Sequence, residues 1–238
     1  MSSVLDTSPE RARRDAALEN SSTLKALSVL EALVRSGRPA SLSELMQATG
    51  LPKPSLHRTL ALAILTHESV ATLRRAILRQ LVADVGETCN LSMLRRAEVV
   101  YLDRVEADWP LRLHLPVGGT VPCHCSASGK LLLALMPAAE RDALVAELPL
   151  PAYTPHTITD RTLLAKELDR IAGTGYSVDD EEYVVGVACV AVPVRLAGGE
   201  AVAAVAVHAA TARLPLQRAI ELVPRLQEAA RRIATTFE

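Results

Sequence analysis

Aromatic residues are scarce in this chain. Only 3% of its 238 residues are Phe, Trp or Tyr, although 49% are hydrophobic. Proteins that bind single-stranded nucleic acid commonly stack bases on aromatic rings, so this shortage argues against that class. The core must instead be built from Ala, Val and Leu, which is typical of an α+β protein.

Long uncharged apolar runs are also missing. No stretch reaches the roughly 18 residues that a membrane span needs, and residues 1–20 lack the apolar region of a secretory signal. Four cysteines are too few for a disulfide framework in a chain of this length. We therefore expect reduced thiols, no membrane association and a cytoplasmic location.

Neither sign of charge dominates the sequence. The net charge of −1 excludes a protein that is basic throughout, and charge alone does not suggest nucleic acid as a partner. The length suits two domains, one of about 60 and one of about 150 residues.

The first domain is expected to contain three helices. Residues 23–35 place apolar side chains at helical spacing. Ser41–Glu44 has the spacing of a capping box, which predicts a helix over 42–49 that ends at Gly50. A third helix begins near Pro54. Two short helices joined by a tight turn, after a supporting helix, form a helix-turn-helix pattern.

The start of the third helix has side chains suited to DNA. In this motif the helix enters the major groove, its N-terminal residues meet base edges, and hydroxyl and cationic groups bind phosphates. Arg58 is the best candidate clamp because its planar guanidinium can form paired hydrogen bonds. An ordinary three-helix unit with a solvated polar face would look similar. The candidate DNA-binding residues are Lys53, Ser55, His57, Arg58 and Thr59.

After about residue 88 the sequence changes to short β-rich runs interspersed with helices. Their order predicts an antiparallel sheet with helices packed on it. The expected strands are 88–94, 99–106, 111–118, 176–181, 187–196 and 201–209, and the expected helices are 128–136, 138–148, 163–175 and 215–235.

Two separate sets of motifs resemble the IclR family of bacterial transcriptional regulators. TLKALSVLEALV and SLSELMQATGLPKPSLHRTL resemble its DNA-binding domain, whereas LRLHLPVGGTVPCHCSASGKLLLA and GYSVDDEEYVVGVACVAVPV resemble its effector domain. The resemblance covers residues 23–235. It implies an α+β protein with an N-terminal winged helix-turn-helix domain and a GAF-like effector-binding domain, whose antiparallel sheet is flanked by helices. It also implies a dimeric or tetrameric regulator, not an enzyme, that binds double-stranded operator DNA and represses or activates catabolic genes.

One part of the family pattern is not found. Helical periodicity runs from 54 to 84 without a stop, which is long for a compact domain. The family normally has a β-hairpin wing and a linker there. We hypothesise that roughly 25 residues are missing between about Leu62 and Leu65, by deletion or by omission of a disordered stretch. A backbone break would support this hypothesis and one continuous helix would contradict it. The expected layout is a disordered or partly helical leader over 1–20, a DNA-binding domain over 21–65 and an effector-binding domain over 66–238.

The effector site is expected around the segment 126–130. Free N–H groups at a helix N-terminus, together with hydroxyls, favour an anion such as a carboxylate. The family's serine-like positions on the last strand are here Ala206 and His208, so a relative's ligand cannot simply be transferred. We expect a small organic acid, aromatic acids included, and no cofactor or metal. By resemblance, the effector-binding residues are Leu113, Ala127, Ser128, Asp179, Cys189, Ala206 and His208.

Several of these residues also have simpler interpretations. A cysteine such as Cys189 is more often a small core residue than a ligand contact. Lys130 is expected to point outward or to cap structure, and Asp179 could belong to a solvated acidic turn. Cys123, His124 and Cys125 could be metal ligands, but they lack a normal zinc spacing. They could also form a nucleophile pair, but neighbours on a strand point to opposite faces. The rival function is a stand-alone small-molecule-binding or hydrolytic α+β protein with a helical dimerisation arm.

Overall fold

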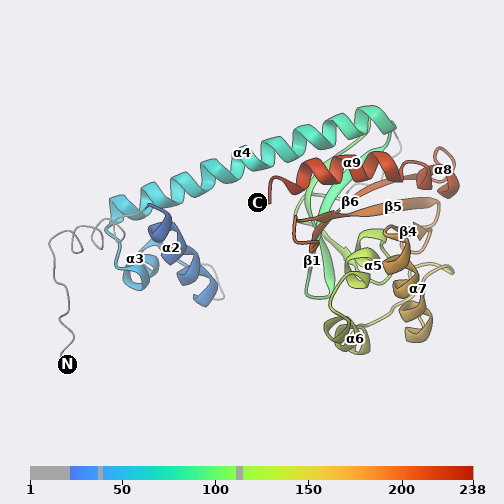
Figure 1. Ribbon diagram of the computed structural model, residues 1–238, viewed down its shortest axis with the longest axis horizontal. Coiled ribbons are helices and arrows are strands. Elements are labelled where there is room, and N and C mark those ends of the chain that lie inside the picture. The colour runs from blue at the N-terminus through green and yellow to red at the C-terminus, as the bar shows by residue number, and fades with distance from the viewer. Residues whose placement is uncertain (1–21, 37–39, 111–114, 238) are drawn as a thin grey trace, which may run out of the picture. The chain divides into compact units, whose positions relative to one another are not determined.

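The computed structural model describes residues 22–36, 40–110 and 115–237 (Figure 1). The chain divides into two compact units, Met1–Val70 and Ala71–Glu238. Within α4, only the backbone is described at residues 58–59 and 61–69. Among the described residues, no helix combines the length and the hydropathy needed to cross a membrane.

The first unit contains α2 (Ser22–Ser36), α3 (Leu42–Thr49) and the beginning of α4 (Lys53–Val85). The predicted capping box is present, since the Ser41 hydroxyl accepts from the Glu44 N–H and the Glu44 carboxylate accepts from the Ser41 N–H. Gly50 ends α3 in the left-handed conformation, with φ of 68°. The small core of this unit consists of the buried residues Val29, Ala32, Leu45 and Leu56.

The backbone does not break between Leu62 and Leu65, because both lie inside the continuous helix α4. By the criterion stated above, this continuous helix contradicts the hypothesis of missing residues. The criterion itself was too simple, since two helical segments joined directly continue as one helix once the first turn has formed. Residues 22–36 and 40–70 of the first unit contain no strand, so they include no β-hairpin wing.

The second unit is built on a six-stranded sheet in which every neighbouring pair is antiparallel. The order across the sheet is β3-β2-β1-β6-β5-β4. This confirms the predicted antiparallel sheet with flanking helices. The strands are β1 (Thr88–Arg95), β2 (Glu98–Val105), β3 (Thr120–Pro122), β4 (Ser177–Asp180), β5 (Val187–Arg195) and β6 (Ala201–Ala210). The helices are α5 (Ala127–Ala134), α6 (Ala138–Glu147), α7 (Arg161–Thr174), α8 (Leu216–Ile220) and α9 (Val223–Ala234).

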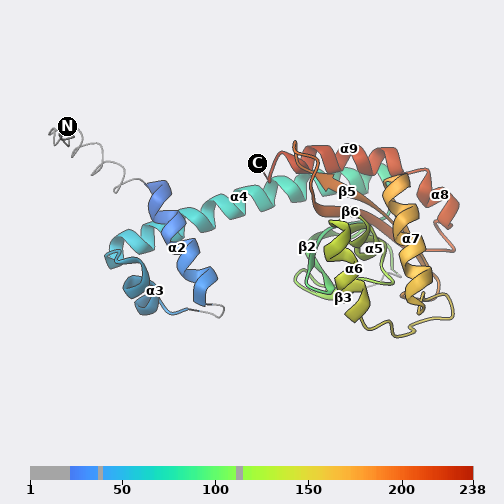
Figure 2. The ribbon, with the colours of Figure 1, turned by 60° about the horizontal axis from the view of Figure 1, so that its bottom comes forward.

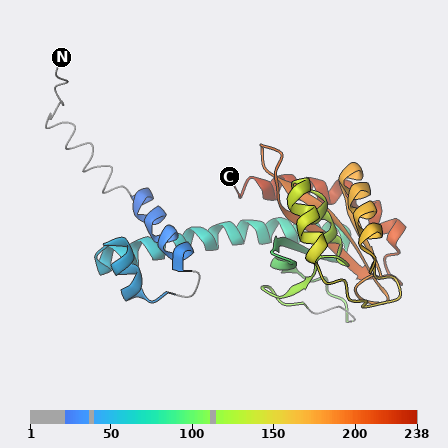
Figure 3. The same ribbon diagram turned by 90° about the horizontal axis from the view of Figure 1, so that it is seen from below.

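Two hydrophobic clusters form on opposite faces of this sheet. On one face, the end of α4 and α9 cover the sheet (Figure 1), and Leu78 of α4 and Leu226 of α9 pack with Val192 and Val205. On the other face, α5, α6 and α7 cover the strands, as Figure 2 shows, and this helical layer is also seen in Figure 3. The alternation of side chains along each strand produces the two clusters. The sheet is therefore the middle layer of the unit.

Two expected elements differ from the structure. Residues 115–119 form a turn region and not part of a strand, and the short strand β3 begins only at Thr120, while residues 111–114 lie outside the described part. The expected final helix over 215–235 is two helices, α8 and α9. Pro224 explains the division, because proline lacks an N–H and is tolerated only in the first turn of a helix.

Candidate functional site

A small cavity lies between the sheet and the N-terminus of α5. Its volume is about 30 Å³, far below the roughly 300–1,000 Å³ of a typical ligand pocket. Asp179, Cys189 and His208 are cross-strand partners on β4, β5 and β6, so their side chains share one face of the sheet. The cavity is lined by Asn90, Tyr101, Leu115, Val121, Ser126, Ala127, Ser128, Asp179, Tyr183, Val184, Val187, Cys189 and His208.

The N-terminus of α5 lies against the chain just before it. The Ser126 hydroxyl caps the helix by accepting from the Gly129 N–H and donates to the Pro122 carbonyl. A Cβ at Gly129 would lie 2.3 Å from the Cys123 oxygen, so only glycine permits this approach. The Ser128 side chain is buried and has no hydrogen-bond partner among the described residues. Its hydroxyl is therefore available to a molecule in the cavity.

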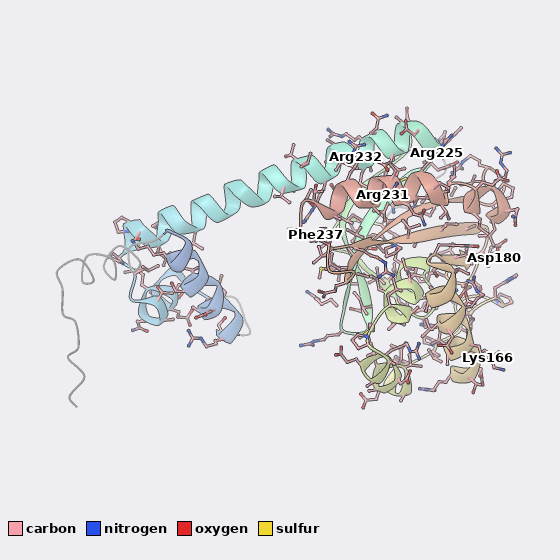
Figure 4. All side chains as sticks on the ribbon, viewed as in Figure 1. Lys166, Asp180, Arg225, Arg231, Arg232 and Phe237 are labelled. Carbon is pink, nitrogen blue, oxygen red and sulfur yellow. The ribbon has the colours of Figure 1, made fainter. Side chains whose placement is uncertain are left out.

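Asp179 is a buried carboxyl group with an unusual environment. Its Oδ1 accepts from the N–H groups of Glu182 at 2.7 Å and Tyr183 at 3.4 Å. Burial, and repulsion from Glu182, raise the pKa of Asp179 to about 7. The next residue, Asp180, is exposed (Figure 4), and successive residues of a strand point to opposite faces. The acidic turn is thus not merely solvated, because Asp179 faces the cavity.

Lys130 is fully buried, contrary to the expectation that it points outward. Its ammonium group pairs with the buried carboxylate of Glu182 and lies 4.0 Å from Glu167. A buried charge requires a partner of opposite sign, and Glu182 supplies it. This pair ties α5 to the loop that follows β4, next to Asp179.

His208 lies between two other buried polar side chains. Its Nε2 is 2.9 Å from a guanidinium nitrogen of Arg104, and its Nδ1 is 3.3 Å from the Asn90 amide nitrogen. Burial, and the charge of Arg104, lower the pKa of His208 to about 3. His208 is therefore neutral at pH 7, as the imidazole and not the imidazolium ion.

The structure brings five of the seven expected effector residues to the cavity wall: Ala127, Ser128, Asp179, Cys189 and His208. Ala206 is buried on the same strand as His208 but does not line the cavity, and Leu113 lies outside the described residues. Sequence reasoning missed Asn90, Tyr101 and Tyr183. Asn90 left a weak signal, since it is the one amide side chain of β1, in the buried first half of that strand.

Cys123, His124 and Cys125 are all buried beside the cavity. Burial raises the pKa of the Cys123 thiol to about 12 and that of Cys125 further, so both remain thiols at pH 7. No group of three or more His, Cys, Asp or Glu side chains within the described ranges could hold a metal ion. The geometry therefore gives no support to a nucleophile or a metal site here.

The expected DNA-binding residues lie in the first two turns of α4. Lys53 and His57 are exposed and Ser55 is half-buried, while Leu56 between them packs into the core. Arg58 and Thr59 lie on the same helix, but their side chains are outside the described part of the chain. The start of α4 thus presents polar side chains on its surface, while the buried side chain of Leu56 packs it against the core of the first unit.

The comparison with protein families gives two adjoining matches. Residues 22–62 match the IclR helix-turn-helix domain, and residues 62–235 match the bacterial transcriptional regulator IclR C-terminal domain. The probable transcriptional regulator SauR of Cupriavidus necator is 41% identical, over 92% of this chain and 97% of its own length.

Two solved structures extend the comparison. The transcriptional regulator RHA06195 from Rhodococcus superposes with a TM-score of 0.67 at 26% identity, covering 90% of this chain and 97% of its own. The inducer-binding domain of a double mutant of PobR from Acinetobacter, in complex with 3-hydroxybenzoic acid, has a TM-score of 0.61 at 28% identity. It covers 67% of this chain and 94% of its own.

The alignment with SauR is longer than the part of this chain that it covers. It spans 245 positions, whereas 92% of 238 residues is roughly 219 residues. Roughly 26 positions of the alignment therefore face no residue of this chain.

Proposed function

Because this chain belongs to the IclR family of bacterial transcriptional regulators, with a DNA-binding helix-turn-helix domain and a C-terminal effector-binding domain, we propose that it is a cytoplasmic homodimer or homotetramer controlled by a small organic acid. The acid binds in the cavity between α5 and the sheet. Lys53, Ser55, His57, Arg58 and Thr59 contact double-stranded operator DNA. Two half-sites about one helical turn apart, or a multiple of that distance, are expected for a symmetric oligomer.

The meeting of Asp179, Cys189 and His208 opposite Ser128 carries the assignment of the effector site. These residues come from three strands and one helix, yet all reach one cavity. The bound 3-hydroxybenzoic acid of the PobR domain supports the ligand class. Because the cavity is much smaller than a typical ligand pocket, binding of an aromatic acid needs the wall to move. A second cavity of about 450 Å³ shares Val187 and His208 with the first, so movement of the Val187 side chain would join the two while His208 stays in place.

The proposed layout keeps the DNA-binding domain within 21–65 and the effector-binding domain within 66–238. The unmatched SauR positions support a deletion in this chain. The deletion fits at Leu62, since the two family matches meet there with nothing between them.

Operator binding can be tested by gel shift on the DNA upstream of the protein's own gene. We expect Arg58→Ala to weaken binding by about five-fold or more, since a paired arginine contact contributes about 1–3 kcal/mol. The melting temperature should not change. Arg35→Ala, which removes an exposed arginine of α2, is the matched control. Failure of the full-length protein to bind at low salt would contradict the proposal.

Effector binding can be tested by a thermal-shift screen of small organic acids. An acid present at 100 times its dissociation constant should stabilise the effector domain by about 2.7 kcal/mol. The same acid should change the gel shift. The rival enzymatic function predicts instead that a small ester or acid is turned over and that Cys125→Ser abolishes the turnover, which the buried thiol does not favour.

A further inference from the structure

The contact between Arg104 and His208 determines which nitrogen of the imidazole carries the proton. A guanidinium group has five N–H donors and no acceptor, so the nitrogen that faces it must accept. That nitrogen is Nε2, which lies 2.9 Å from the guanidinium. Because a neutral imidazole carries one proton, Nδ1 of His208 is the N–H donor.

The His208 proton in turn determines the orientation of the Asn90 amide. Nδ1–H of His208 must meet an acceptor, so the oxygen of Asn90 and not its nitrogen belongs 3.3 Å away. Oxygen and nitrogen of an amide are distinguished by such networks and not by shape. The other amide position, which is buried and has no hydrogen-bond partner among the described residues, then holds the NH₂ group.

We propose that Arg104, His208 and Asn90 form a relay that presents the Asn90 NH₂ group to the effector cavity and thereby selects ligands with an acceptor oxygen at that point. Asn90 lines the cavity, and a buried NH₂ without a partner is costly, so a carboxylate or carbonyl oxygen placed against it replaces a missing hydrogen bond. A ligand hydroxyl that must donate there is rejected. Arg104 and His208 act as positioning residues and Asn90 contacts the ligand.

This inference rests on the proposed function, since it assigns chemistry to the same cavity. It also accounts for the histidine at position 208. A hydroxyl there could rotate to donate or accept, whereas His208 held by Arg104 has one donor and one acceptor in fixed places. The cavity wall on β1 and β6 then offers the ligand a hydrogen-bond donor, the Asn90 NH₂ group, and no acceptor at that point.

The tautomer of His208 can be read directly by two-bond ¹H–¹⁵N NMR correlation on the ¹⁵N-labelled full chain at pH 7, with His208→Gln used for assignment. We expect a protonated Nδ1 and an unprotonated Nε2. Arg104→Met should release this preference, whereas Arg75→Met, which removes an ion pair of α4 with Asp103 away from His208, should leave it unchanged. A protonated Nε2 or an imidazolium ion in the wild type would overturn the inference, whether or not acids bind.

The selection of ligands is tested by calorimetry with two matched pairs, pyruvate with hydroxyacetone and 4-hydroxybenzoate with 4-hydroxybenzyl alcohol. At least one acid should bind more tightly than its alcohol by about ten-fold, the effect of one hydrogen bond to a charged group. Asn90→Asp, which replaces the donor by an acceptor, should abolish that preference.

Equal binding of acid and alcohol, or an unchanged preference in Asn90→Asp, would overturn the inference while leaving an effector site in place. If neither acid binds although His208 has the expected tautomer, the acid class of the proposed function fails and the inference fails with it. Circular dichroism and the melting temperature of each variant separate these outcomes from loss of the fold.

Discussion

Gly129 occupies a position where even one methyl group would collide with backbone. The ideal Cβ would lie 2.3 Å from the oxygen and 2.4 Å from the Cα of Cys123, and neither atom belongs to a flexible side chain. We expect Gly129→Ala to lower the free energy of unfolding by about 3 kcal/mol or more, as overpacking of a rigid contact does. Urea denaturation measures this difference.

Gly173 provides the matched control for that substitution. It lies in α7 with nothing within 4 Å of an added Cβ. Gly173→Ala should therefore leave stability unchanged or raise it by up to about 1 kcal/mol, through helix propensity and a less flexible unfolded chain. Equal effects of the two substitutions would contradict the close approach of α5 to Cys123.

Asp179 should make stability depend on pH. Its pKa in the folded protein is raised to about 7 from an ordinary value of 3.8, so between these values the folded state holds a proton that the unfolded state has lost. The stabilisation is fully present below about pH 4 and is lost as the pH rises to about 7. Relative to Asp179→Asn, the free energy of unfolding of the wild type should fall across this window by at most about 4 kcal/mol.

Denaturant titrations at pH 4, 5.5, 7 and 8 measure this dependence. Asp179→Asn keeps an oxygen that can accept from the N–H groups of Glu182 and Tyr183, so the comparison isolates the titration. Asp180→Asn changes the exposed neighbour and should not alter the slope. A difference between wild type and Asp179→Asn that stays constant with pH would show that Asp179 does not hold the proton.

Some residues in and around the effector cavity could be predicted from the sequence and others could not. Asp179, Cys189 and His208 could be predicted because they match positions of a known pattern. The burial of Lys130 could not, because its partner Glu182 is 52 residues away and nothing local indicates the pairing. Arg104 was missed for the same reason, since only the pairing of β2 with β1 brings it close to His208.

At the scale of elements, α4 is anchored in the second unit by the end of the chain. The Arg74 guanidinium donates to the Thr236 hydroxyl at 2.7 Å and to its carbonyl at 3.0 Å, and it lies 3.8 Å from the centre of the Phe237 ring. Phe237 follows the last turn of α9, whose arginines Arg225, Arg231 and Arg232 are exposed (Figure 4). The contact joins the first helix of this unit to the last.

We expect Arg74→Lys to lower the free energy of unfolding by about 1–2 kcal/mol. An ammonium group cannot make both hydrogen bonds and stack on the ring in the same geometry. Chemical denaturation of the full chain measures the loss. Arg79→Lys, at an exposed position of the same helix, should have no effect, and a similar loss in both variants would contradict the anchor.

Among the helices and strands, the ends that depend on neighbouring residues were predicted most accurately from the sequence. The capping box at Ser41 and the glycine at position 50 predicted α3 to the residue, because both ends of that helix are determined by neighbouring atoms. The division between α8 and α9 was also readable, since Pro224 cannot lie within a helix interior, yet periodicity alone suggested one helix. The described part of the strand expected over 111–118, residues 115–118, is not a strand, because alternation does not show whether a partner strand is available.

At the scale of the whole molecule, this chain differs from SauR by a segment of SauR that has no counterpart here. Roughly 26 aligned positions of SauR face no residue here, the two family matches adjoin at Leu62, and residues 22–36 and 40–70 contain no strand. In the sequence this appears as an overlong helical pattern over 54–84. Two helical segments joined directly continue as one helix, so a continuous α4 is also what a deletion at this point would produce.

We expect the lack of this segment to lower the affinity for DNA, so inserting it should raise that affinity. We expect a chimaera with the corresponding SauR segment inserted after Leu62 to bind the same operator about ten-fold more tightly or better. Phosphate contacts made by a wing also release counterions, so the dependence of affinity on salt should become steeper. An insertion of the same length built from glycine and serine adds flexibility without a wing and should not raise the affinity. If both insertions have the same effect on affinity, a wing adds no DNA contacts to this protein. The start of α4 then provides its DNA contacts without a wing.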